Sequence, residues 1–307
     1  MVRHETSNVW SIFWCLKLNS YLQVMELNDF APEHIFDEME YEMEEYKKNG
    51  PPVLVKWRHR YEPFVYDCLK QQYGDALNKF WKTYDPPQVS DKAFVLVERR
   101  CHANLWFLLR NIAYFGQGWS IYLFCSRQNF KYCKAILGGK NVHLIVIFED
   151  QADAKTGVRE YNELLKQASF WERIDAEHIC VFEMDCYLRK HIPEELLEYD
   201  YVGTPWGWNL RSPGGSGLSL RKKSVMIDIC TRKVADETHM QDSFAAEGVC
   251  ELGYDFLHSS EGVKVFVESY YTDDPIGVHQ WWTFFFNYYI QGGGSKEMIR
   301  KFLTLDI

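Results

Sequence analysis

The sequence lacks the patterns that identify several common classes of protein. Its nine cysteines are scattered and form no C-x-x-C pair, which excludes the usual zinc sites and argues against a disulfide framework. No apolar run is long enough to cross a membrane, and the N-terminus has no continuous signal-peptide core. These absences predict a protein without a membrane span that stays in the cytoplasm with reduced thiols.

Excess basic charge and the common phosphate-binding motifs are also missing. The formal charge is −9, whereas binding to a nucleic-acid backbone requires clusters of Lys and Arg. No G-x-G-x-x-G follows the first predicted strand and no G-x-x-x-x-G-K-[ST] occurs, so the usual dinucleotide and P-loop sites are not expected. We therefore predict no nucleic-acid partner. The binding of a nucleotide stays compatible with the negative net charge, because a metal ion and one or two arginines can neutralise its phosphates.

What the chain does contain is an alternation of strands and helices. Apolar runs predict strands at 93–98, 120–125, 142–148 and 179–182, and amphipathic stretches predict helices at about 102–115, 128–137 and 154–168. Continuously apolar strands that alternate with helices are typical of a mostly parallel, doubly wound sheet. We therefore predict an α/β domain over residues 89–290, with helices flanking the sheet.

The rest of the chain shows a different organisation. Residues 1–88 are predicted to be a helical extension packed on the main domain, and residues 291–307 a tail. The extension is expected to contain helices at 32–48 and about 62–84. The region after residue 182 is expected to contain short strands at 199–203 and 263–267 and a glycine-rich loop at 212–221. Two further helices are expected there, at about 222–233 and 240–252. An arm that binds a partner is the less favoured interpretation of residues 1–88.

An acidic pair follows the strand at 179–182. Glu183 and Asp185 stand at the carboxyl end of a buried strand, where open α/β sheets place their ligands. Residues two apart on a strand share a face, so both carboxylates could reach one cation, and their oxygens suit Mg²⁺ or Mn²⁺. Taken alone, an ordinary turn at the end of a strand explains the pair at least as well.

Seven short motifs occur together in an order that resembles one known family. They are YNELL at 161–165, FWERI at 170–174, FEMD at 182–185, YDYVGTPW at 199–206, GGSGLSLRKK at 214–223, QD at 241–242 and IGVH at 276–279. Over about residues 93–285 the chain is similar to GT-A-like glycosyltransferase domains, formerly a domain of unknown function, found in large DNA viruses, algae and bacteria. The resemblance implies a Rossmann-like GT-A-type fold, a UDP- or GDP-sugar as donor, and a glycan or other hydroxyl-bearing acceptor.

The resemblance also implies roles for four residues. Asp185 matches the acidic D-x-D position that holds Mn²⁺ or Mg²⁺, with Glu183 in support, since similar members carry Gln-Thr-Asp here. His279 resembles the C-terminal histidine that completes the metal shell, although a lone histidine is otherwise more often structural. Asp242 is the predicted general base. Its family position is usually Glu-Asp, this chain has Gln241 before it, and a helix N-cap is the alternative.

Residues near the donor sugar are predicted from their chemistry. Gly214, Gly215 and Gly217 would let the backbone approach the donor sugar or the acceptor closely. Trp206 could stack on a sugar ring, with packing at the rim as an equally good interpretation.

The nucleotide is expected at the end of the first strand. Glu98 and Arg99 stand where GT-A folds contact the nucleotide, and Arg99 or Arg100 could pair with phosphate. Asn162, on the helix before the acidic strand, is a weaker candidate for the same ligand.

Together these residues predict a metal-assisted glycosyltransferase. No second carboxylate is an obvious covalent nucleophile, so a one-step inverting displacement with Asp242 as base is favoured. Two alternatives stay open: a nucleotide-sugar hydrolase, and a non-catalytic GT-A-like binding or scaffold domain.

Overall fold

The computed structural model describes most of the chain from Leu54 onward. The described residues are 41, 44, 45, 48, 54–206, 209, 211–236, 239–262, 264–269, 272, 274–284 and 300–307, with only the backbone for 54–60 and Ser216. The chain divides into two compact units, Met1–Pro51 and Pro52–Ile307. The helix predicted over 32–48 lies almost wholly outside the described residues. All elements below belong to the second unit.

A six-stranded sheet lies at the centre of this unit, in the order β3-β2-β1-β4-β7-β6. Its strands are β1 (Lys92–Val97), β2 (Ser120–Ser126), β3 (His143–Phe148), β4 (His178–Phe182), β6 (Tyr201–Thr204) and β7 (Gly215–Lys222). β1 to β4 are parallel, whereas β7 runs antiparallel to both of its neighbours. The predicted mostly parallel sheet is confirmed.

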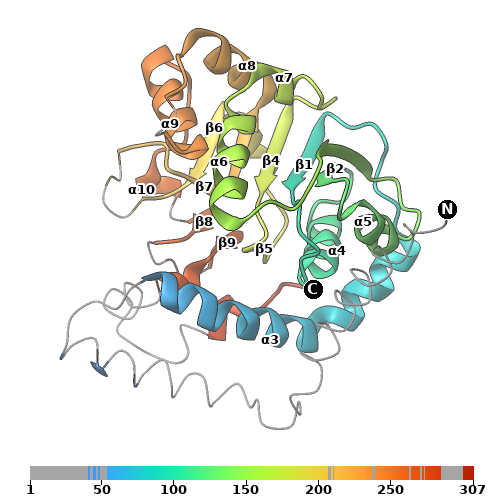
Figure 1. The fold of residues 1–307 in the computed structure, drawn as a ribbon. Coiled ribbons are helices and arrows are strands. Elements are labelled where there is room, and N and C mark those ends of the chain that lie inside the picture. Colours follow the sequence, from blue (N-terminus) through green and yellow to red (C-terminus); the bar gives the residue numbers. More distant parts are fainter. Residues whose placement is uncertain are drawn as a thin grey trace, which may run out of the picture. The chain divides into compact units, whose positions relative to one another are not determined.

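Helices cover both faces of the sheet (Figure 1). They are α4 (Leu105–Phe115), α5 (Phe130–Leu137), α6 (Ala154–Leu165), α7 (Ala168–Trp171), α8 (Lys223–Arg232) and α9 (Gln241–Leu252). On one face, Val95 and Val181 share a core with Trp171 and Phe244 of α7 and α9. On the other face, the ring of Phe94 lies over the glycine that ends α4. Successive strand residues point to opposite faces, so both faces are buried and the fold is mixed α/β.

The glycine-rich segment is a strand, where the sequence analysis predicted a loop over 212–221. From Gly215 onward it forms β7, which lies between β4 and β6 and pairs Leu218 with Phe182. Glycine is depleted in strands, and this composition concealed the element. The correction matters for function, because a paired strand holds its residues in fixed positions.

A second sheet of three short strands joins segments that are far apart in the chain. It contains β5 (Cys186–Leu188), β9 (Gly277–His279) and β8 (Phe266–Val267), in the order β5-β9-β8. β5 and β9 are antiparallel and place Cys186 opposite His279. Strands of two or three residues are too short to show a period, so β5 and β9 were not predicted. This sheet carries His279 to the end of β4.

A long helix, α3 (Leu54–Thr83), precedes β1 in the same compact unit. The helix predicted over about 62–84 is confirmed, but it begins earlier and contains Pro63. Its buried residues, among them Tyr66 and Leu69, face α4 and the 3-10 turn η2 (Trp281–Thr283). Figure 1 shows α3 passing beneath the ends toward which β1 and β4 point. A domain boundary at residue 88 stays a prediction.

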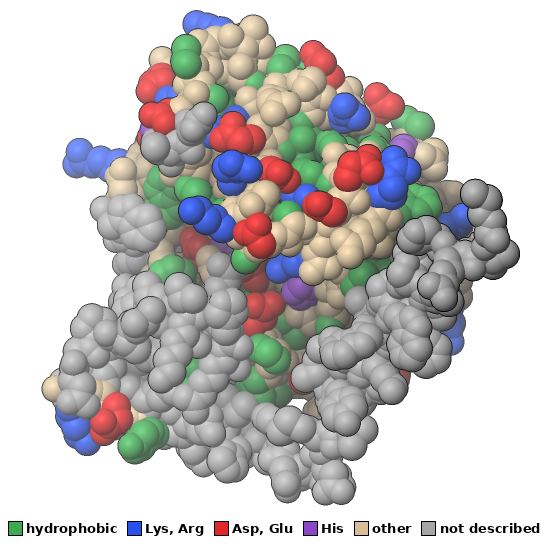
Figure 2. Space-filling model, in the orientation of Figure 1, with side chains coloured by type: hydrophobic (Ala, Val, Ile, Leu, Met, Phe, Trp, Pro, Cys, Tyr) green, Lys and Arg blue, Asp and Glu red, His purple; other side chains and the backbone are tan. Residues whose placement is uncertain are grey.

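The described surface provides two further findings. Among the described helices, none combines the length and apolarity required to cross a bilayer. On the face shown in Figure 2, the acidic and basic side chains of the described residues are interspersed, without a continuous basic patch. The distribution on this face agrees with the negative net charge of the chain.

Candidate active site

The order of strands reverses between β1 and β4. From β1 the chain moves outward through β2 to β3, and it then returns to place β4 on the other side of β1. β1 and β4 are parallel, so their carboxyl ends lie at the same edge of the sheet, and open α/β sheets place a ligand-binding crevice between two such strand ends. Glu98 follows β1 and Glu183 follows β4. The predicted acidic pair therefore stands at this crevice.

Asp185 and His279 meet at one end of the small sheet. Oδ1 of Asp185 lies 3.2 Å from Nε2 of His279, and the two side chains are only 5% and 4% exposed. Oε2 of Glu183 lies 4.0 Å from the same nitrogen. The three predicted metal ligands thus converge from two distant segments. Carboxylate oxygens and an imidazole nitrogen at these distances fit a divalent ion that binds between them.

Cys186 is the third member of another possible ligand set. Its sulfur and the ligand atoms of Asp185 and His279 all lie within 4.8 Å of one another. The thiol, however, donates to the carbonyl oxygen of Gly217 at 3.3 Å, and burial raises its pKa well above the ordinary value. A protonated thiol is a poor ligand for ions that prefer oxygen. Glu183, with Oε2 4.0 Å from Nε2 of His279, stays the predicted third ligand.

Glu268 is a residue that the sequence analysis missed. Its Oε1 lies 3.0 Å from Nδ1 of His279 and accepts a hydrogen bond of 3.0 Å from Gln280. Histidines that bind metals usually donate their second N–H to a carboxylate, which fixes the tautomer and the ring. Glu268 directly follows the strand predicted over 263–267, as Glu183 follows β4. This position directly after a predicted strand is the sequence feature that could have identified Glu268.

Charge around His279 determines its protonation. Burial by itself lowers the pKa of His279, but the carboxylates of Asp185 and Glu268 outweigh burial and hold the pKa well above its ordinary value. The two carboxylates therefore favour the protonated imidazole in the metal-free protein. The proton on Nε2 must leave before this nitrogen can bind a cation.

Glu183 lies where ionisation is unfavourable without a cation. Burial and the charge of Asp185 raise its pKa, while His279 and a hydrogen bond from Tyr161 lower it. The side chain is 29% exposed, so a ligand can reach it. Two carboxylates so close together are most stable when a positive ion lies between them.

Two glycines of β7 make room for the acidic side chains. Gly215 and Gly217 are two apart and therefore share a face of the strand. A Cβ at Gly217 would lie 2.5 Å from the Glu183 carboxylate, and one at Gly215 would overlap the Trp206 indole and lie 3.0 Å from Oδ2 of Asp242. The absence of both Cβ atoms lets Glu183, Trp206 and Asp242 pack along one face of β7.

The predicted base lies at the start of α9. Asp242 is the second residue of the helix and Met240 is the N-cap, so Asp242 does not have the N-cap role. Its carboxylate accepts a hydrogen bond from the Ser243 amide at 2.7 Å. Gly214, with a φ of +74°, turns the chain into β7 beside it.

Asn162 supports this helix start. Its Oδ1 accepts from the amide of Gln241 at 2.5 Å, and its Nδ2 donates to the carbonyl of Val158 at 2.8 Å. The first amides of a helix have no partner within the helix, so this bond fixes the residue before Asp242. Contact of Asn162 with a nucleotide stays a prediction.

Glu98 and Arg99 have different partners. Glu98 is buried and accepts from the backbone amide and the guanidinium of Arg100 at 2.6–2.9 Å. The Arg99 guanidinium donates to Asp150 at 2.9 Å and to Glu160 at 2.5 Å. Arg99 therefore ties the end of β1 to the segment around α6. The predicted nucleotide contacts of both residues stay predictions.

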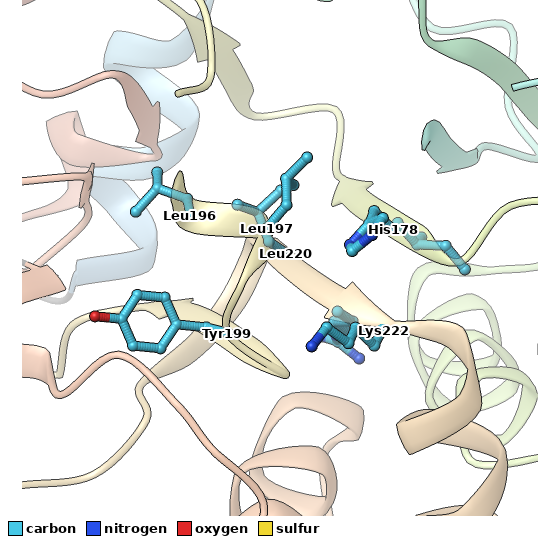
Figure 3. A pocket seen from close by; sticks show the side chains of 8 residues that line it. His178, Leu196, Leu197, Tyr199, Leu220 and Lys222 are labelled. Carbon is cyan, nitrogen blue, oxygen red and sulfur yellow. The ribbon is translucent and has the colours of Figure 1, made fainter. Parts of the chain in front are cut away.

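A separate depression lies at the other end of β4. It is lined by His178, the first residue of β4, by Lys222, the last of β7, and by Leu196, Leu197 and Tyr199 among others (Figure 3). None of the described residues that line it is acidic. The acidic cluster and this depression are thus at opposite ends of the strand.

Comparison with protein families matches part of the chain. Residues 145–279 match the family described as "Protein of unknown function (DUF5672)", which is less than half of the chain. The match contains Glu183, Asp185, Asp242, Glu268 and His279 but leaves out α3 and β1. No curated protein sequence matches.

Several solved structures are similar at low identity. The 4-diphosphocytidyl-2C-methyl-D-erythritol synthase from Anaerococcus prevotii has a TM-score of 0.37 and 10% identity, over 66% of this chain and 98% of that one. The inositol-1-phosphate CTP transferase from T. maritima has a TM-score of 0.35 and 11% identity, over 54% and 84%. PaToxG glycosyltransferase has a TM-score of 0.32 and 9% identity, over 62% and 79%.

Proposed function

We propose that the protein is a metal-dependent glycosyltransferase that moves a sugar from a nucleotide-diphosphate donor to a hydroxyl group of a glycan or other acceptor. One observation carries this proposal: Asp185, Glu183, His279 and Asp242 converge along β7 at the crevice between β1 and β4. The reaction needs a stabilised diphosphate and a base for the acceptor. This cluster offers groups suited to both tasks.

Asp185, His279 and Glu183 are the residues that would hold Mg²⁺ or Mn²⁺. When bound, the ion supplies Lewis-acid stabilisation to the departing diphosphate. Glu268 keeps Nδ1 of His279 occupied, so that Nε2 is directed toward Asp185. Glu183 also accepts from Tyr161, which holds its carboxylate beside β7.

Asp242 is the proposed general base. It accepts the proton of the acceptor hydroxyl while that oxygen forms a bond to the anomeric carbon and the bond from this carbon to the diphosphate breaks. Such a base contributes about 10²–10⁴-fold to the rate. Attack opposite the leaving group inverts the anomeric centre. Trp206 lies beside Asp242 across Gly215, where its ring can stack on a sugar.

The nucleotide part of a UDP- or GDP-sugar is proposed to lie over the end of β1. Arg100 is the better diphosphate ligand, because its side chain is 54% exposed whereas Arg99 is bound to Asp150 and Glu160. Hydrogen bonds to Glu98 are the largest cause that raises the pKa of Arg100, and the charge of Asp185 adds to them. The charge of Asp185 thus acts on Arg100, which supports a diphosphate held between this arginine and the metal ligands.

A thermal-shift series with nucleotide sugars tests the proposal. Mn²⁺ and the correct donor together should raise the melting temperature, because a ligand that binds only the folded state stabilises it by about 2.7 kcal/mol at 100 times Kd. Asp185→Ala should abolish the shift. Asp175→Ala is the control, since that carboxylate is exposed and precedes β4.

The alternatives give different results. Release of free sugar that no acceptor changes would identify a hydrolase. The absence of any metal-dependent shift with UDP- and GDP-sugars would contradict the enzyme and favour a scaffold domain.

A cytoplasmic location is the second part of the proposal. Every described cysteine is a free thiol, and proteins with many unpaired thiols are typical of reducing compartments. Fractionation of cells that express the chain, followed by thiol labelling, tests this; recovery with oxidised, paired cysteines would contradict it.

A further inference from the structure

β5 is the outer strand of the small sheet, and no strand of the described residues pairs with its other edge. On its paired side, the carbonyl of Asp185 accepts from the amide of Gln280 at 2.9 Å. The carbonyls of Met184, Cys186 and Leu188 alternate with it and therefore point to the other side. Buried backbone groups require partners, so the structure must supply them at this edge.

The hydroxyl of Tyr66, on α3, is the hydrogen-bond partner of the carbonyls on both sides of Asp185. Its hydroxyl oxygen lies 3.1 Å from the carbonyl oxygen of Met184 and 2.9 Å from that of Cys186, and it can donate its proton to either. The ring is completely buried and makes edge contacts with Tyr187 and Trp282. Tyr66 thus holds the turn that carries the central metal ligand.

Asn111 of α4 continues the same edge. Its Nδ2 donates to the carbonyl of Leu188 and its Oδ1 accepts from the amide of Leu188, both at 2.8 Å. This pair of bonds is the pattern with which a neighbouring strand would bind β5. Side chains of α3 and α4 therefore take the place of a missing strand.

One face of α3 reaches both loops of the crevice. Glu62, Tyr66 and Lys70 are four residues apart and share that face. The Glu62 carboxylate lies 3.7 Å from Nε2 of His102, and Lys70 donates to Asn104 at 2.7 Å. His102 and Asn104 belong to the loop after β1, whereas Tyr66 binds the turn after β4. The helix thus spans the ends of the two strands, as Figure 1 shows.

We propose that α3 is part of the active site and that Tyr66 is its positioning residue. Through the carbonyls of Met184 and Cys186, Tyr66 fixes Asp185 where it can share a cation with His279. The inference rests on the proposed metal site. Tyr66 and Asn111 lie outside the segment 145–279 that matches the family, so this part of the chain supplies a support which the matched segment lacks.

Tyr66→Phe tests the role, because it removes the hydroxyl and keeps the ring. The Mn²⁺ dissociation constant, measured from the EPR signal of free Mn²⁺, should rise about tenfold, as it does when a metal ligand loses its support. Tyr187→Phe is the matched control. Tyr187 is also buried, lies on β5 itself and donates to the carbonyl of Phe302 at 2.7 Å. It should lose a comparable amount of stability and keep its Mn²⁺ affinity.

Each result has a distinct meaning. A folded Tyr66→Phe protein that binds Mn²⁺ as tightly as the wild type overturns the inference and leaves the proposed function intact. A wild-type protein that binds no Mn²⁺ overturns the proposed function and the inference with it. If Tyr66→Phe fails to fold, hydrogen exchange on the wild type decides. Mn²⁺ should slow exchange in 61–70 as well as in 183–188, and slowing in 183–188 alone overturns the inference.

Discussion

Replacing Gly217 by alanine tests the packing on which the site depends. The new Cβ would lie 2.5 Å from the Glu183 carboxylate and 2.7 Å from Cβ of Glu183. The strand is held in place, because the carbonyl of Gly217 accepts from the amide of Glu183 at 2.8 Å and from the thiol of Cys186 at 3.3 Å. Glu183 must therefore rotate away and lose its hydrogen bond with Tyr161.

The expected cost follows from these contacts. Overpacking a tight site costs about 1–3 kcal/mol, and a lost hydrogen bond adds about 1 kcal/mol. We expect the free energy of unfolding of Gly217→Ala to fall by about 2–4 kcal/mol in total. Because Glu183 is a proposed ligand, the affinity for Mn²⁺ should fall as well.

Urea denaturation of four proteins measures the effect. Gly217→Ala is made in the wild type and in a Glu183→Gly background, in which the side chain that meets the new Cβ is absent. In that background the cost should nearly vanish, so the difference, which is the coupling energy, should be close to the full cost of about 2–4 kcal/mol. Gly157→Ala in α6 is the control. Its Cβ meets nothing within 4 Å, so it should stabilise the helix by about 0.5–1 kcal/mol.

The coupling energy tests whether the Glu183 side chain packs against β7. If Gly217→Ala cost the same in both backgrounds, Glu183 would not lie against β7, and the assembly of the site along this strand would be wrong.

Three further changes test other groups of the site. Asp242→Asn should lower sugar transfer by about 10²–10⁴-fold with Mn²⁺ affinity unchanged, as measured by transfer of labelled sugar and by calorimetry; lost metal binding would contradict its role as base. Glu268→Gln should raise the Mn²⁺ dissociation constant about 10–100-fold, and an unchanged constant in an EPR titration would exclude its support of His279. Because the folded-state pKa of His279 is raised, the metal-free protein should be most stable below about pH 6.5 and lose stability as pH rises through that higher pKa. Melting curves of His279→Ala should lack this decline, and an identical decline would assign it to other groups.

The sequence predicted those parts of the fold that have a long local signal. Runs such as 93–98 and 120–125 are continuously apolar, and the structure has β1 and β2 there. The position of Asp185 at the end of β4 followed from the same signal, because a buried strand that stops at two carboxylates is visible without any neighbour.

The rest of the site depends on contacts between distant residues. β5 and β9 have only three residues each, so no periodicity predicts the strand pair that brings His279 to Asp185. Only a family resemblance indicated this histidine, and Glu268 behind it was missed. Arg99 shows the opposite problem. A strand-end arginine suits a phosphate, yet Asp150 and Glu160, which the sequence places 51 and 61 residues away, occupy its guanidinium.

Electrostatics connects the stability of the site with its proposed use. Asp185, Glu183 and Glu268 surround His279, and burial together with Asp185 raises the pKa of Glu183. Three carboxyl groups share one imidazolium, and the raised pKa of Glu183 reflects the cost of a further negative charge beside Asp185 in the metal-free cluster. A divalent cation lowers that cost, and its binding releases the proton from Nε2 of His279. The arrangement that is unfavourable when empty is therefore the one that favours a cation. The glycines of β7 leave the space that Glu183 occupies, and Tyr66 binds the carbonyls on either side of Asp185.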